Sequence, residues 1–99
     1  MPRTLSKPGP PTGPYIGDLS AMGNLVRNRR LELALRIDDT AHACCVSANV
    51  LSRLENGGAI GTDRLLWVLQ GLGLSILIMP TDDAYKILNS IGADVPPPP

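Results

Sequence analysis

Residues 37–57 read IDDTAHACCVSANVLSRLENG, and this stretch decides the fold because it divides into two short helical segments around a tight turn. We predict a first helix over about 37–44. A second helix is predicted from Ser47, a residue type favoured at helix N-caps, to Leu54, and Asn56-Gly57-Gly58 ends it with residues that tolerate a left-handed backbone. Two short helices at this spacing predict a helix-turn-helix motif.

The second helix of this motif has an inner and an outer side. Leu51 and Leu54 line the inner side at helical spacing. The side chains left outside are of the kind that a recognition helix presents to base edges in the major groove of DNA. The predicted base-contacting residues are Ser47, Ala48, Asn49, Ser52 and Arg53. Asn49 can bond adenine at two atoms and Arg53 can do the same to guanine, and each such pair is worth ~1–3 kcal/mol of discrimination.

Three further helices are predicted around the motif. The first is capped by Asp18 or Ser20, the next by Thr62, and the last runs from Thr81 or Asp82 to about Ile91. The apolar stripes that predict the first two are Leu19, Met22, Val26 and Leu33, and then Leu65, Leu66, Leu69 and Leu72.

Leu74 to Met79 differs from the rest of the chain because it is a short, apolar, β-branched run that Pro80 ends, which predicts a β-strand. A lone strand leaves backbone groups unpaired, so we expect it to pair with the same strand of a second copy and to form a homodimer. The predicted dimer-strand residues are Leu74, Ile76, Leu77 and Ile78. The alternative is that this run extends the helical layer.

The domain organisation follows from these elements and from the prolines at both ends. Prolines and glycines disfavour helices and sheets, so the two ends are predicted to be disordered. We expect a Pro/Gly-rich arm over 1–14, a helix-turn-helix domain over 15–73, a dimerisation strand over 74–80, a C-terminal helix over 81–92 and a Pro tail over 93–99.

Length and charge limit the function classes. The chain of 99 residues has room for one domain, and no phosphate loop, catalytic triad or pair of pocket carboxylates indicates an enzyme or a cofactor. Nine basic and nine acidic residues give a net charge of zero, which argues against affinity that comes only from coating a phosphate backbone. Residues 1–36 hold six basic and two acidic residues, whereas residues 37–99 hold three basic and seven acidic ones. This asymmetry marks either a face that meets nucleic acid or simply one Arg-rich helix.

The cysteines and the apolar stretches bear on the compartment. Cys44 and Cys45 are the only cysteines, and adjacent cysteines form a disulfide only with strain, so they do not indicate a secreted framework. No signal-peptide core is evident, and no apolar stretch reaches the ~18 residues of a membrane span, so we expect a cytoplasmic protein.

His42 lies beside the cysteines, but three ligands on one short helix cannot point at one ion, and no metal site is predicted. Trp67 is interpreted as an interface anchor or as a partly exposed aromatic residue.

Several spaced segments form a recognisable pattern: GNLVRNRR at 23–30, Ala34-Leu35, Ala41, Val46-Ser47 and LSRLENG at 51–57. Over roughly residues 19–73 this pattern resembles the Xre/Cro-type, lambda-repressor-like helix-turn-helix domains of phage repressors and bacterial regulators. The resemblance implies a mainly α fold with a five-helix DNA-binding domain, followed here by the strand and an additional helix. It also implies binding of a double-stranded DNA operator as a dimer, usually with repression of transcription.

The resemblance also assigns individual roles. It implies an internal ion pair between Arg30 and Glu55, which ties the first helix to the end of the recognition helix. The residues that fall where family members touch phosphates are Arg36, Ile37 and Asn56.

A strand directly after such a domain resembles the Hip-type (HipB-like) antitoxins. This second resemblance implies a HipA-like serine/threonine kinase toxin as partner, held inactive in the complex, and autoregulation of the shared operon.

The chain also departs from the family pattern at several positions. Cys45 replaces the usual turn glycine at a position that often needs a positive φ, so backbone strain is expected there. Thr40 stands where the family has leucine, and Ile37 where it has glutamine. The loop 58–61 lacks the basic residues that many relatives place against phosphate.

The expected function is therefore that of a sequence-specific DNA-binding transcriptional repressor, elaborated as the antitoxin of a toxin–antitoxin operon. Two alternatives remain: a protein-only toxin neutraliser with weak DNA binding, which the bare loop 58–61 favours, and a stand-alone phage-type repressor. An enzyme is not expected.

Overall fold

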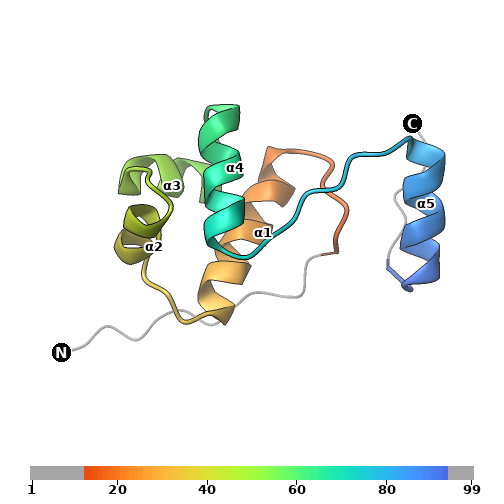
Figure 1. Cartoon of the computed structure of the whole chain (residues 1–99), viewed down its shortest axis with the longest axis horizontal. Helices are drawn as coiled ribbons and strands as arrows, with labels where there is room; N and C mark the ends of the chain where they lie inside the picture. Colours follow the sequence, from red (N-terminus) through yellow and green to blue (C-terminus); the bar gives the residue numbers. More distant parts are fainter. Residues whose placement is uncertain (1–12, 94–99) are drawn as a thin grey trace.

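The computed structural model describes residues 13–93, which form five α-helices and no β-strand. The helices are α1 (Leu19–Glu32), α2 (Ile37–Ala43), α3 (Ala48–Glu55), α4 (Thr62–Gly71) and α5 (Thr81–Ser90). Four of them are gathered into one body with α2 and α3 at one end, whereas α5 stands apart at the other (Figure 1). The mainly α class is thus confirmed.

The predicted β-strand over residues 74–80 is wrong. The segment from Leu74 to Pro80 is neither strand nor helix, and it runs as an extended linker between α4 and α5. A strand exists only through a ladder with a neighbouring strand, and residues 13–93 offer none. The four predicted dimer-strand residues, Leu74, Ile76, Leu77 and Ile78, are therefore linker residues. The helix-turn-helix body also contains four helices and not the five that the family resemblance implies.

The core lies between α1, α2, α3 and α4. Its most completely buried side chains are Val26, Leu51, Leu54, Val68 and Leu72. The helix α3 packs against both α1 and α2, so the predicted recognition helix is held from two sides.

One glycine sets the distance between α1 and α3. A Cβ atom on Gly23 would collide with the backbone carbonyl oxygen of Leu54 and would lie 2.9 Å from that of Glu55. The two helix backbones approach this closely only because Gly23 has no side chain.

The helix ends and the turn between α2 and α3 can be compared with the caps and the strained turn that the sequence predicts. The side chain of Asp18 accepts a hydrogen bond from the backbone N–H of Ala21 at 2.8 Å, so Asp18 is the cap of α1. The predicted cap Thr62 is instead the first residue of α4, and Gly61 occupies the cap position. In the turn between α2 and α3, Cys45 has a φ of 61°, a left-handed conformation that glycine adopts freely and that costs a cysteine energy.

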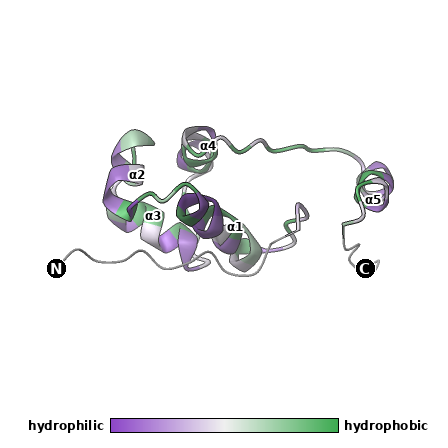
Figure 2. Cartoon of the chain, turned by 90° about the horizontal axis from the view of Figure 1, so that it is seen from below, coloured by the Kyte–Doolittle hydropathy of each residue, from purple (hydrophilic) through white to green (hydrophobic). Residues whose placement is uncertain are grey.

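The linker begins directly after Leu72, whose carbonyl oxygen is held by a hydrogen bond from α1. The Nε atom of Arg29 donates to the carbonyl oxygen of Leu72 at 2.9 Å, and Gly73 then turns the chain with a φ of 70°. The linker that follows is largely apolar (Figure 2). It leads to α5, of which only Leu88 is buried.

The predicted arm over 1–14 and tail over 93–99 lie outside the described residues, apart from Gly13, Pro14 and Ala93.

Candidate nucleic-acid interface

The outer side of α3 is the candidate surface. Leu51, Leu54 and Glu55 are buried on the inner side of this helix. Of the five predicted base-contacting residues, the exposed ones are Ser47, Ala48, Asn49 and Arg53. Ser52 is half-buried. Residues predicted to read DNA therefore share the solvent side of a single helix.

The two polar ends of this surface are partly engaged within the protein. The hydroxyl of Ser47 accepts a hydrogen bond from the backbone N–H of Val50 at 3.1 Å, so it caps the first turn of α3. At the other end, Nδ2 of Asn56 donates to the carbonyl oxygen of Ser52 at 2.8 Å. Asn49 and Arg53 lie between these caps, and their side-chain ends have no hydrogen-bond partner within residues 13–93. They are therefore the polar groups that are free to meet a base.

The predicted phosphate-contacting residues differ in their exposure and in the polar groups that they leave free. Arg36 is exposed at the cap of α2, where its carbonyl oxygen accepts from Oγ1 of Thr40 at 2.8 Å. Ile37 is half-buried and packs against the core, so it presents no polar group. Asn56 acts as the C-cap of α3, and its amide is turned back towards Ser52. Of the three, Arg36 alone offers a free cationic group.

The pair Arg30–Glu55 fixes the orientation of α3. Nε of Arg30 donates to Oε2 of Glu55 at 2.8 Å, and Nη2 donates to Oε1 at 2.9 Å, so the contact is bidentate. The remaining Nη1 donates to the carbonyl oxygen of Leu35 at 2.9 Å. Both side chains are buried, with exposed fractions of 9% and 4%. This buried fork holds the C-terminal end of α3 on α1, as the resemblance implies, and it has a structural role.

The negative charges near this surface limit its attraction for DNA. Asp38 and Asp39 lie exposed in the first turn of α2, next to Arg36. Their carboxylates repel phosphates at the point where the helix dipole would attract them. A DNA-binding role would therefore draw its affinity mainly from contacts along α3.

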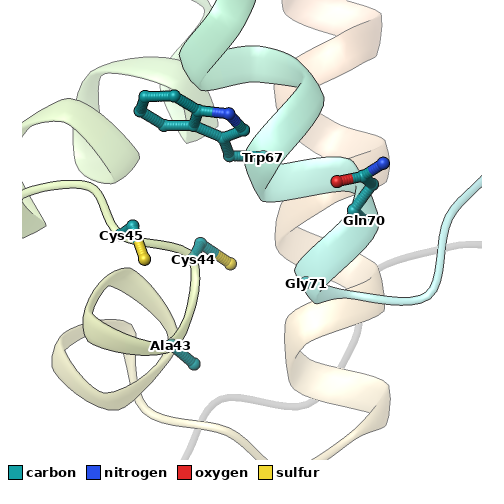
Figure 3. A pocket seen from close by; sticks show the side chains of 6 residues that line it. All are labelled: Ala43, Cys44, Cys45, Trp67, Gln70 and Gly71. Carbon is teal, nitrogen blue, oxygen red and sulfur yellow. The ribbon is translucent and has the colours of Figure 1, made fainter.

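A shallow cavity of about 470 Å³ lies away from this surface, between the α2–α3 turn and α4 (Figure 3). The cavity is lined by Ala43, Cys44, Cys45, Trp67, Gln70 and Gly71. Burial raises the pKa of the Cys44 thiol, and the neighbouring Cys45 adds to the shift. The described residues contain no cluster of three metal-ligating side chains, and the His42 imidazole is exposed.

A second hollow lies between α5, the linker and the body. It measures about 560 Å³, and its walls include Tyr15, Met22, Leu25, Leu69 and Leu88. The linker side chains at its rim are exposed, with fractions of 76% for Leu77 and 89% for Ile78. The hollow is mainly apolar, and α5, which forms one of its walls, stands at the end of the molecule away from α3 (Figure 1).

Sequence reasoning missed two contacts, of which only the second lies at the candidate interface. One is the bond from Arg29 to Leu72, which joins residues far apart in the chain and has no local signal. The other is the close contact between Arg53 and Gly58, for which the only signal was the glycine after the helix.

No family model matches the chain, and a search of curated proteins gives no match either. Among the helices of residues 13–93, none combines the length and the apolar character needed to cross a membrane.

Proposed function

We propose that the chain is a sequence-specific DNA-binding regulator of the Xre/Cro type that inserts α3 into the major groove and acts in the cytoplasm as a repressor. The observation that carries this proposal is that α3 has a buried inner side and an exposed outer side. Its inner side is buried, and its outer side presents Asn49 and Arg53 without partners among residues 13–93.

The chemistry of these two residues supports direct reading of bases. An asparagine amide matches the donor and acceptor of adenine, and an arginine fork matches the two acceptors of guanine. The bidentate pair between Arg30 and Glu55 supports the same role, because it fixes the helix that carries Asn49 and Arg53.

Dimer formation is part of the proposal, because two linked copies bind two half-sites of an operator. Its support is the apolar surface formed by the linker and α5, where Leu77, Ile78 and Ile91 are 76%, 89% and 63% exposed. Contiguous apolar surface of a few hundred Å² on a monomer marks interaction sites. We propose that side-chain packing of this surface joins two copies. Because it lies opposite α3, pairing leaves the DNA-reading surface free.

A second candidate function is neutralisation of a protein partner, such as the HipA-like kinase toxin of a toxin–antitoxin operon. The step from a regulator to a Hip-type antitoxin rested on a β-strand that residues 13–93 do not contain. What favours a protein partner is the exposed Trp67, which is 44% exposed beside the cavity at the α2–α3 turn. The acidic first turn of α2 is consistent with a reader of low DNA affinity.

The test is selection of binding sites from a random DNA library with the wild type and Arg53→Ala. We expect Arg53→Ala to lose discrimination at one base position by roughly 5- to 150-fold, corresponding to ~1–3 kcal/mol. Lys86→Ala is the matched control, because it removes an exposed positive charge on α5. A wild-type chain that enriches no sequence at moderate salt would contradict the DNA-reading function and favour the protein partner.

Light scattering tests the dimer. We expect a dimer for the wild type and a monomer for Leu77→Glu/Ile78→Glu, because the added charges cannot be buried without partners. Gln70→Glu, on the exposed side of α4 and outside the second hollow, should remain dimeric. A wild-type chain that is monomeric at micromolar concentration would contradict this part of the proposal.

A further inference from the structure

The C-terminal end of α3 brings Arg53 and Gly58 into contact. The helix ends with two backbone hydrogen bonds, from Gly57 N–H to the carbonyl oxygen of Leu54 at 3.0 Å and from Gly58 N–H to that of Arg53 at 2.8 Å. This arrangement is a Schellman motif, in which the second residue after the cap lies against a residue of the last turn. Here those two residues are Gly58 and Arg53.

The contact between them leaves no space for a side chain at position 58. A Cβ atom on Gly58 would lie 2.5 Å from Cγ of Arg53, 3.4 Å from its Cδ and 3.0 Å from its carbonyl oxygen. The aliphatic part of the Arg53 side chain therefore passes directly over the backbone of Gly58.

The backbone φ angle does not explain why residue 58 is a glycine. Gly57 has a φ of 83°, which disfavours other residues, and a Cβ there would lie 3.3 Å from Oγ of Ser20. Gly58 has no positive φ. What glycine supplies at position 58 is therefore room for Arg53, whose side-chain Cγ lies closer to the added Cβ than its carbonyl oxygen does.

We propose that Gly58 is a positioning residue for Arg53: it admits the arginine stem against the backbone and thereby determines which base the guanidinium reads. This inference rests on the proposed DNA-binding function and assigns a specificity role to a residue that does not itself contact DNA. A long side chain reads a base well only when few of its rotamers compete, because freezing each rotatable bond on binding opposes affinity. The contact with Gly58 restricts the stem, while the guanidinium has no partner within residues 13–93.

The experiment compares four proteins in the same site selection: the wild type, Gly58→Ala, Arg53→Ala and the double variant. We expect Gly58→Ala to reduce discrimination by about tenfold, equivalent to ~1.4 kcal/mol, at the same base position that Arg53→Ala affects. In the double variant, the alanine at 58 should add no change in base preference beyond that of Arg53→Ala. Ala59→Ser, an exposed substitution in the same loop, is the matched control and should behave as the wild type.

A second measurement does not involve DNA. Urea unfolding of the same four proteins should show that Gly58→Ala destabilises the wild type more than it destabilises Arg53→Ala, because the overlap is largely with the arginine stem. An equal loss in both backgrounds would mean that the alanine meets only backbone, and the inference would be wrong.

The outcomes separate this inference from the function on which it rests. If the wild type selects a sequence and Arg53→Ala relaxes it, but Gly58→Ala leaves that position unchanged, the function stands and the role of Gly58 is refuted. The same holds if Gly58→Ala alters base preference equally in the Arg53→Ala background. A wild type that selects no sequence contradicts the function itself, and with it the role of Gly58.

Discussion

Arg29 of α1 donates a hydrogen bond from Nε to the carbonyl oxygen of Leu72 at 2.9 Å, which fastens the end of α4 to a helix that begins the fold. Leu72 is among the most completely buried side chains, so the bond lies at the edge of the core. Its position defines where the helix-turn-helix body ends and where the linker starts.

We expect Arg29→Ala to lower the free energy of unfolding by ~1.5–3 kcal/mol, since it removes a hydrogen bond from a charged donor. Arg29 also forms a surface ion pair with Glu32 at 3.7 Å. The control is therefore Glu32→Ala, which should cost at most ~1 kcal/mol because exposed pairs contribute little. Urea unfolding measures both variants, and equal losses would show that the bond to Leu72 is not what matters.

Glu55→Gln should destabilise the protein by ~3–5 kcal/mol, because it leaves the buried guanidinium of Arg30 without its counter-charge. A domain of this size has only ~5–15 kcal/mol of stability in total, so circular dichroism melting should show the loss clearly. The double variant Arg30→Met/Glu55→Met should lose less than the single one, since the replacement is apolar. A single variant that melts like the wild type would contradict the structural role of the pair.

Gly23→Ala should destabilise the protein by ~1–3 kcal/mol, because the added methyl group collides with the backbone of Leu54 and forces α1 and α3 apart. This loss runs against helix propensity, by which alanine is favoured over glycine by ~1 kcal/mol. Asn24→Ala, at the exposed neighbouring position, is the control and should change stability little. A stabilised Gly23→Ala variant would show that a methyl group fits between α1 and α3 without moving them apart.

Cys45→Gly should stabilise the protein, because the φ of 61° costs an L-residue ~1–2 kcal/mol and glycine adopts it freely. Part of the gain is offset by the greater chain entropy of glycine in the unfolded state, which leaves ~0.5–1 kcal/mol. Thermal melting should show a rise in Tm of a few degrees. Cys45→Ala keeps the strain and removes the thiol, so a comparable rise in this variant would refute the explanation.

The two adjacent thiols should differ in reactivity. Cys45 is exposed, whereas Cys44 is buried and its raised pKa leaves less thiolate at any given pH. We expect iodoacetamide at pH 8 to modify Cys45 first, with fragment mass spectrometry locating the adduct. Because folding favours the neutral thiol of Cys44, that contribution to stability is complete below the ordinary thiol pKa and is lost as the pH rises through the raised value. Equal labelling of both residues in the folded protein would contradict the burial of Cys44.

The sequence predicted those helix ends that are set by interactions between residues close together in the chain. The cap at Asp18, the cap at Ser47 and the glycine that ends α3 act over three or four residues, and each is present where the sequence indicates. The buried pair of Arg30 and Glu55 spans 25 positions, and only the family pattern pointed to it.

The segment from Leu74 to Met79 shows where such reasoning fails. A six-residue apolar run is compatible with a strand, a buried helix or an extended linker, and only the partner that covers it decides between them. The contact between Arg53 and Gly58 was missed for a related reason, because it depends on how a helix ends in three dimensions.

Because the hydrogen bond from Arg29 to Leu72 holds the end of α4 on α1, Gly73 is a natural boundary between the four-helix body and the segment that follows. The helices α1 to α4, which precede this point, share one core, whereas α5 follows it after the extended segment 74–80. Under the proposed DNA-binding function, a genetic fusion at Gly73 would exchange α5 for a coiled coil of chosen geometry and leave α3 and the core that holds it unchanged. The spacing of the two half-sites would then become a property that an engineer sets, independent of the base sequence that each half-site carries.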